Sequence, residues 1–135
     1  MGAWGTGVFD NDAAGDWAAE LEDTDDLSLV EETFQEVLDV GDDYLDSDEA
    51  CRALAACEVV ARLKGNRGVR NSYTKDVDDW VEAHRQTPSD GLVRMGLAVI
   101  DRIRTPPSEL PELWGEGDAT EWNAAVDDLR ARVAA

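Results

Sequence analysis

Three carboxylates near the start of the chain, Asp10, Asp12 and Asp16, are spaced so that they could share a metal ion. Carboxylate oxygens are the ligands that Mg²⁺ and Ca²⁺ prefer, and the run DNDAAGD has glycine at its sixth position, as an EF-hand calcium loop does. The fifth position, however, is Ala14 and the twelfth is Leu21, where that loop requires oxygen ligands. The EF-hand interpretation therefore fails, and a looser divalent-cation site or a carboxylate-based hydrolytic site is kept as an alternative.

His84 is the only histidine in the chain, so a histidine-rich metal site is impossible and a Ser-His-Asp triad would depend on this one side chain. No Gly-x-Ser-x-Gly turn or other nucleophile motif accompanies it. It also ends an apolar helical stripe, a position typical of a packed, hydrogen-bonded histidine. We therefore predict no catalytic residue, no cofactor-binding residue and no enzymatic activity.

The two cysteines, Cys51 and Cys57, lie in a stretch with helical spacing. Helix geometry separates their backbones by about 9 Å along the axis, which is too far for a disulfide bond. Both are expected to be small buried side chains in a reducing cytoplasm. The sequence has no apolar run of about eighteen residues and no basic-then-apolar signal segment, so we predict a cytoplasmic protein that neither spans a membrane nor is exported by the usual route.

The net charge of −19 is distributed unevenly along the chain. Residues 1–50 contain seventeen Asp and Glu and no Lys or Arg, whereas residues 51–135 contain fourteen acids and twelve bases, so the two parts carry −17 and −2. This charge opposes binding to nucleic acid, whose affinity depends on neutralising phosphates, and binding to an anionic membrane. Two interpretations stay open: the acidic part contacts a basic partner, or it keeps the protein soluble, for instance in a salty cytosol.

We predict a non-catalytic binding or accessory module whose acidic residues 10–48 contact a basic protein. An acidic connector supplies the candidate contact residues, which are Asp42, Asp43, Asp46 and Asp48. The only basic patch surrounds the loop GNRGVRNSYTK, and we expect its bases to pair with the acidic half, within the chain or across a homodimer. These bases are Arg62, Lys64, Arg67, Arg70 and Lys75.

An N-terminal arm and a first helix must position the opening carboxylates. Glycine disfavours a helix interior by about 1 kcal/mol relative to alanine, so we expect residues 2–9 to be extended or turning, with their aromatic side chains docked onto the helical body. Asp10 or Asn11 is expected to cap the helix that follows. The residues of this structural motif are Trp4, Gly5, Gly7, Phe9, Asn11, Asp12 and Trp17.

Apolar residues recur at helical spacing along the rest of the chain, and no strand pattern appears. Further helices are expected at residues 28–40, 47–64 and 77–86, from Thr87 to about residue 104, and from residue 118 onward. Residues 108–116 are expected to form one helical turn at most. We therefore predict a single all-α domain over residues 1–135, a compact orthogonal bundle of five to six helices with a docked Gly/Trp-rich N-terminal arm.

The helix at residues 47–64 is expected at the centre, because its apolar arc is too wide for a surface helix. Four further helix starts are predicted from cap residues: Ser28 boxed with Glu31, Asp46 paired with Glu49, Thr87, and Asp118 boxed with Glu121. Gly41 and Gly65 are expected to end helices, and Gly96 is expected to permit a close helix crossing.

The opening MGAWGTGVFDNDAAGDW resembles the start of a family of small, mostly bacterial proteins known as domain of unknown function 4259. Members of that family tend to begin with Met-Gly-x-Trp-Gly-x-Gly-x-Phe-x-Asn-Asp and a tryptophan-bearing helix. Two further stretches are similar to the family, EACRALAACEVVARLKG at residues 49–65 and SELPELWGE at residues 108–116. The resemblance covers nearly the whole chain, and it implies a bacterial protein without an assigned activity.

Overall fold

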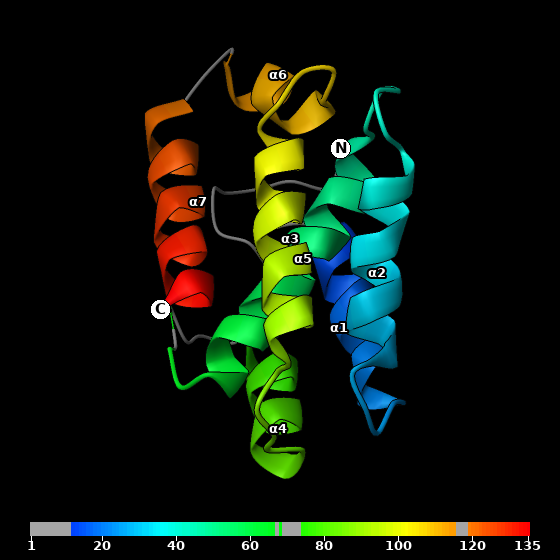
Figure 1. Ribbon diagram of the computed structural model, residues 1–135, viewed down its shortest axis with the longest axis vertical. Helices are drawn as coiled ribbons and strands as arrows, with labels where there is room; N and C mark the ends of the chain where they lie inside the picture. The colour runs from blue at the N-terminus through cyan, green and yellow to red at the C-terminus, as the bar shows by residue number, and fades with distance from the viewer. Residues whose placement is uncertain (1–11, 67, 69–73, 116–118) are drawn as a thin grey trace.

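The computed structural model describes residues 12–66, 68, 74–115 and 119–135, which form seven α-helices (Figure 1). They are α1 (Asp12–Glu22), α2 (Ser28–Asp39), α3 (Ser47–Leu63), α4 (Lys75–Ala83), α5 (Asp90–Ile103), α6 (Glu109–Gly115) and α7 (Ala119–Ala134). The prediction of an all-α fold is confirmed: these residues contain no strand, only an isolated bridge between Leu45 and Ser108. The helices outnumber the expected five to six, because residues 109–115 form a short helix of their own.

The central position predicted for α3 is confirmed. It packs against each of the other six helices of the described chain, and every side chain from Ala53 to Arg62 is buried. Alanine and cysteine dominate this stretch, so neighbouring helices can approach its backbone closely. In Figure 1, α1 and α2 lie on one flank and α7 on the other, while α4 and α6 lie at opposite ends.

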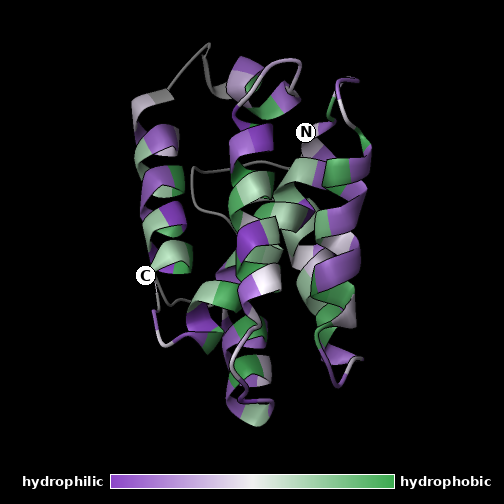
Figure 2. Ribbon diagram, viewed as in Figure 1, coloured by the Kyte–Doolittle hydropathy of each residue, from purple (hydrophilic) through white to green (hydrophobic). Residues whose placement is uncertain are grey.

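The inward faces of most helices follow the apolar spacing, and Figure 2 shows hydrophobic and hydrophilic residues alternating along each helix accordingly. The predicted stripes of α1 and α7 are buried, including Trp17 and Trp122. The apolar spacing of α5 predicts an inner face of five residues, of which three are buried (Gly96, Ile100 and Ile103) and two are partly buried (Val93 and Leu97). Leu92 and Val99, outside that face, are buried as well. The reason is that α5 packs against α2, α3 and α7 and therefore buries a wider arc than one stripe.

Two predicted helix caps are wrong, although α2 does begin at Ser28 as expected. Ser28 forms no capping box with Glu31: its backbone N–H donates to the carboxylate of Asp26 (3.0 Å), so a preceding side chain satisfies this helix end. The same bond holds the pKa of Asp26 below its ordinary value. The N-cap of α5 is Ser89 rather than Thr87, since the Ser89 hydroxyl accepts the N–H of Leu92 (3.1 Å). Asp118, the predicted cap of the last helix, lies outside the described residues.

Other helix ends agree with the sequence in position. Asp46 occupies the N-cap position of α3, although its side chain makes no capping bond. Gly41 and Gly65 have φ angles of 61° and 87°, the left-handed conformation that glycine adopts without strain at a helix end. A Cβ atom on Gly96 would lie 3.3 Å from the ring of Phe34, which confirms the close crossing of α5 and α2.

Most of the N-terminal motif lies outside the described residues: Trp4, Gly5, Gly7, Phe9 and Asn11, as does the other cap candidate, Asp10. The docked arm therefore stays a prediction. Of the remaining motif residues, Asp12 begins α1, and Trp17 is buried and donates its indole N–H to the Thr33 hydroxyl of α2 (2.8 Å). Among the described residues, each helix is either too short or too polar to span a bilayer.

Candidate functional site

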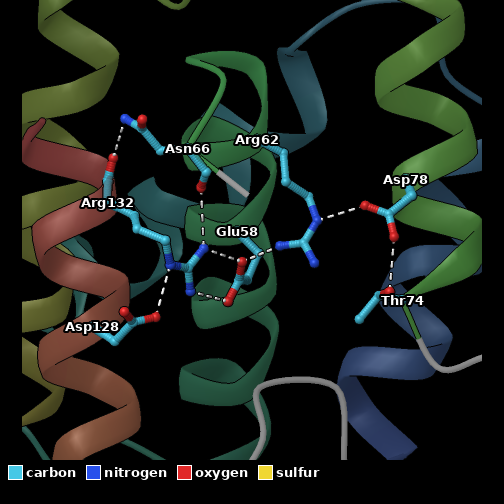
Figure 3. A network of polar contacts seen from close by, with 7 residues as sticks. All are labelled: Glu58, Arg62, Asn66, Thr74, Asp78, Asp128 and Arg132. Atoms are coloured by element: carbon cyan, nitrogen blue, oxygen red, sulfur yellow. Dashed lines mark hydrogen bonds and ion pairs between the residues drawn. The ribbon is translucent and has the colours of Figure 1, made fainter. Parts of the chain in front are cut away.

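A buried ion-pair network occupies the C-terminal half of α3 (Figure 3). Its centre is Glu58 and Arg62, which are one helical turn apart and only 5% and 1% exposed. Figure 3 shows both side chains reaching sideways from α3, with Asp78 of α4 on one side and Arg132 of α7 on the other. Because charges are rarely buried unless they are paired, each of these side chains needs a partner of opposite sign.

Arg62 joins α3 to α4. Its guanidinium donates to Glu58 on its own helix and, through Nε, to Oδ1 of Asp78 (2.7 Å). The second oxygen of Asp78 accepts the hydroxyl of Thr74 (2.8 Å), the residue that precedes α4. The start of α4 is therefore held against α3 by charge as well as by apolar packing.

Arg132 joins α7 to the same carboxylate. Its two terminal nitrogens donate to the two oxygens of Glu58 (2.8 and 2.9 Å), and its Nε donates to Asp128 (2.8 Å). The hydrogen bonds that Arg132 donates to Glu58 are the main cause that holds the pKa of Arg132 above its ordinary value; burial opposes this shift, and the charge of Glu58 and the contact with Asp128 add to it. Asn66 donates its amide to the Arg132 carbonyl (3.0 Å), so the residues after α3 are fixed to α7 as well.

The buried carboxylates and guanidinium groups of this network bind one another. Two guanidinium groups face two buried carboxylates, and in the described part of the chain no buried side-chain nitrogen or oxygen lacks a hydrogen-bond partner. Carboxylates that accept bonds from guanidinium groups are poorly placed to bind a cation or to accept a proton from a substrate. The network therefore positions helices and gives no sign of a catalytic centre.

Sequence reasoning missed Glu58 and Asp78. Arg62 binds Glu58 and Asp78, Lys75 binds Asp79 (2.5 Å) and Lys64 donates to the Val133 carbonyl (2.6 Å). None of these three bases lies within 4.0 Å of a carboxylate of residues 12–50, and the carboxylates that Arg62 and Lys75 contact on their own helices lie one turn away. The expected pairing with the acidic half, within the chain or across a homodimer, stays a prediction. Arg67 and Arg70 lie outside the described residues.

The acidic half of the chain, residues 1–50, exposes its described carboxylates to solvent. Sixteen of its carboxylates lie in the described residues; fifteen are exposed and Glu49 is partly buried. Only two of these sixteen described carboxylates have a described basic side chain within 4.0 Å: Asp25 lies near His84 (3.5 Å) and Glu36 lies near Arg52 (3.8 Å). By contrast, seven of the twelve described carboxylates in residues 51–135 are ion-paired. The structure thus separates an unpaired acidic part from a largely paired one.

The four predicted contact residues are all exposed. Asp42, Asp43 and Asp46 lie on the connector between α2 and α3, and Asp48 lies in the first turn of α3. The backbone of this connector is held from α5 by Arg102, whose guanidinium donates to the carbonyls of Gly41 (2.9 Å) and Asp43 (2.6 Å). Leu45, fully buried, donates its N–H to the Pro107 carbonyl (3.1 Å). These carboxylates therefore project from a fixed segment.

The predicted metal candidates are only partly described. Asp12 and Asp16 lie one turn apart on exposed positions of α1, and Asp10 lies outside the described residues. Within the residues that the structure describes, no three His, Cys, Asp or Glu side chains gather as metal ligands would.

His84 and the cysteines have packing roles. The His84 ring stacks on Trp80 with 4.5 Å between ring centroids, and its Nδ1 lies 2.9 Å from the Trp80 carbonyl oxygen. Cys51 and Cys57 are buried and unbridged. Burial raises the pKa of the Cys51 thiol to about 12 and raises that of Cys57 as well, so both stay protonated at neutral pH and are poor nucleophiles.

Comparison with protein families identifies residues 2–125 as a domain of unknown function (DUF4259). The chain belongs to this family. None of the curated proteins and no solved structure matches the chain. The family confirms the resemblance seen in the opening motif, and its description carries no activity that could be assigned to the residues above.

Proposed function

We propose that this DUF4259 chain is a non-catalytic binding module whose acidic half binds a basic protein. The observation that supports the proposal is the contrast in pairing: two of sixteen described carboxylates in the acidic half have a basic neighbour, against seven of twelve in residues 51–135. Solubility alone requires exposed charge, but it does not require that the charges of one sign gather on one part of the fold.

Unpaired carboxylates that share a surface repel each other, and a basic partner would remove that repulsion on binding. A single exposed ion pair contributes only about 0.2–1 kcal/mol, so affinity must come from several pairs acting together. Such an interface associates quickly and weakens as salt increases. Binding should therefore be fast and strongly salt-dependent.

The test uses a fluorescently labelled hexa-arginine peptide, with affinity measured by anisotropy at about 0.15 M salt, where the Debye length is about 8 Å. The variant neutralises two connector carboxylates that have no basic partner among the described residues: Asp42→Asn and Asp43→Asn. At about 0.5 kcal/mol per charge, the affinity should fall about fivefold.

The matched control neutralises two exposed carboxylates that lie outside the acidic half and likewise have no basic partner among the described residues: Asp90→Asn and Glu121→Gln. Both variants have the same net charge, so only the location differs. We expect the control to lose less than about twofold in affinity, because its charges lie away from the connector. Equal losses in the two variants, or no binding by the unmodified chain, would overturn the proposal.

A further inference from the structure

Only two large hydrophobic side chains are exposed in the described part of the chain, and both belong to the same end of the molecule. Tyr44, 47% exposed, lies on the connector between α2 and α3, and Leu113, 43% exposed, lies on α6. Figure 1 shows this connector and α6 at the end opposite α4. We call the surface formed by residues 42–48 and α6 the α6 end.

The connector and α6 are joined by direct hydrogen bonds. The Tyr44 hydroxyl donates to the Glu112 carboxylate (3.2 Å), and the Ser47 N–H donates to the Glu109 carboxylate (2.8 Å). The Glu109 N–H in turn donates to the Leu45 carbonyl (2.9 Å). The α6 end is therefore one continuous surface whose shape is set before any partner arrives, which reduces the ordering that binding would require.

The only base that contacts this connector, within the described residues, does not pair with its carboxylates. Arg102 donates to four backbone carbonyls, those of Gly41, Asp43, Thr105 and Pro107. Its guanidinium is thus occupied by the backbone, and the carboxylates around Tyr44 lack a basic side-chain partner among the described residues.

The electrostatic environment of Tyr44 agrees with this geometry. Its pKa is raised, first by partial removal of the hydroxyl from water and then by the Glu112 carboxylate, with smaller effects from Glu109 and Asp46. Three carboxylates therefore act on one exposed aromatic ring. A cation placed against that ring would meet both an aromatic face and a negative potential.

We propose that the α6 end is the docking surface for a basic peptide segment of a partner protein, with an arginine stacked on Tyr44 and an apolar side chain covering Leu113. The proposal rests on the proposed function and specifies where the partner binds and what it carries. Arginine fits better than lysine, because its planar guanidinium stacks on an aromatic ring and binds carboxylates in pairs. An acidic segment would repel the carboxylates of this surface. A purely apolar segment would remove them from water without giving them a partner of opposite charge.

Tyr44 is tested by comparing labelled hexa-arginine with labelled hexa-lysine, which carry equal charge. The unmodified chain should prefer hexa-arginine, and Tyr44→Ser should reduce that preference by at most about two- to fivefold, which is the whole contribution of an exposed cation–aromatic contact and is shared in part by lysine. Tyr44→Phe keeps the ring and should keep the preference. Because Tyr44 is exposed, neither substitution should prevent folding, and circular dichroism of each variant checks this.

Leu113 is tested with two further peptides, in which one central arginine of hexa-arginine is replaced by leucine or by serine. The unmodified chain should bind the leucine peptide about three- to tenfold more tightly, since about half of a leucine side chain leaves water on each partner. Leu113→Ser should remove this difference, and Leu113→Met, which stays apolar, should retain most of it.

The outcomes separate the two proposals. If hexa-arginine binding depends on the connector carboxylates but both peptide preferences are unchanged by Tyr44→Ser and Leu113→Ser, the docking surface is wrong and the acidic binding function stands. If the connector variant and the control variant bind hexa-arginine with equal affinity, the proposed function itself is wrong, and the docking surface that rests on it falls with it. Loss of the arginine preference in Tyr44→Ser, with its retention in Tyr44→Phe, supports the α6 end.

Discussion

Replacing Glu58 by glutamine tests whether the buried ion-pair network stabilises the bundle. The Glu58 carboxylate accepts hydrogen bonds from Arg62 and from both terminal nitrogens of Arg132. Glutamine keeps the size and one acceptor oxygen, but it removes the charge and turns an NH₂ group toward guanidinium groups that can only donate. The variant therefore leaves two buried cations with less counter-charge than they have now.

The size of the effect follows from burial. Removing one partner of a buried ion pair costs about 3–5 kcal/mol. A surface pair between the same kinds of groups gives the comparison: Asp101 of α5 accepts two hydrogen bonds from Arg130 of α7 (3.0 and 3.2 Å), with side chains 59% and 41% exposed. Exposed pairs contribute about 0.2–1 kcal/mol. Glu58→Gln should therefore lower the free energy of unfolding several times more than Asp101→Asn does.

Urea unfolding followed by circular dichroism measures the free energy of unfolding of both variants. The slope of this free energy against urea concentration checks that both variants expose the same surface in one two-state transition. Asp128→Asn is a second control, because Asp128 binds the same guanidinium of Arg132 but is 64% exposed. Where Glu58→Gln is unfolded without urea, the titration is repeated for all variants in a stabilising osmolyte. Equal losses for Glu58→Gln, Asp101→Asn and Asp128→Asn would refute the reasoning from burial.

Three further predictions follow from charge and close packing. Added salt should raise the melting temperature between about 0.01 and 0.15 M by screening the unpaired carboxylates, and a flat or falling midpoint in calorimetry would contradict this. A Cβ on Gly68 would lie 2.6 Å from the Arg132 guanidinium carbon, and this guanidinium is held by Glu58 and Asp128 and can move only by weakening those bonds. Gly68→Ala should therefore destabilise the chain by about 1–3 kcal/mol in urea unfolding, and by much less when Arg132 is replaced by alanine. The pKa of Glu22 is raised, first by a hydrogen bond with Asp76 and then by the Asp76 charge, so Asp76→Asn should lower it in an NMR titration. A raised carboxyl pKa in the folded state lowers stability above that pKa, so Asp76→Asn should also gain stability at neutral relative to acidic pH.

Much of the fold could be predicted because it depends on local patterns. The spacing of Trp17 and its apolar neighbours gives α1 and its buried face, and the wide apolar arc of α3 gives its central position. The errors lie where several local solutions compete: Thr87 and Ser89 can both cap a helix, and only the tertiary path of the chain selects Ser89. Existence and position of a helix are thus more predictable than the bond that starts it.

The buried network could not be predicted from local patterns, because its partners come from helices far apart in the sequence. Arg62 and Asp78 are sixteen residues apart, and Glu58 and Arg132 are seventy-four residues apart. One signal was present nonetheless. Glu58 and Arg62 are the only charged residues between Arg52 and Lys64, they are one turn apart, and they interrupt an otherwise apolar face. A charged pair at such a position indicates buried partners on neighbouring helices.

The same network explains why the acidic half is left without counter-charges. Six of the ten described Lys and Arg residues in residues 51–135 bind acids of the same part of the chain, whereas Arg52 lies near Glu36 of the acidic half. Arg62 and Arg132 bind buried carboxylates, and Arg104 and Arg130 bind acids on α7 and α5. Arg102, the base nearest the acidic connector, binds backbone carbonyls instead. Packing of α3, α4, α5 and α7 therefore uses the positive charges internally. The negative charge of α1, α2 and the connector is a consequence of how the fold distributes its few bases, and it is available to a partner from outside the chain.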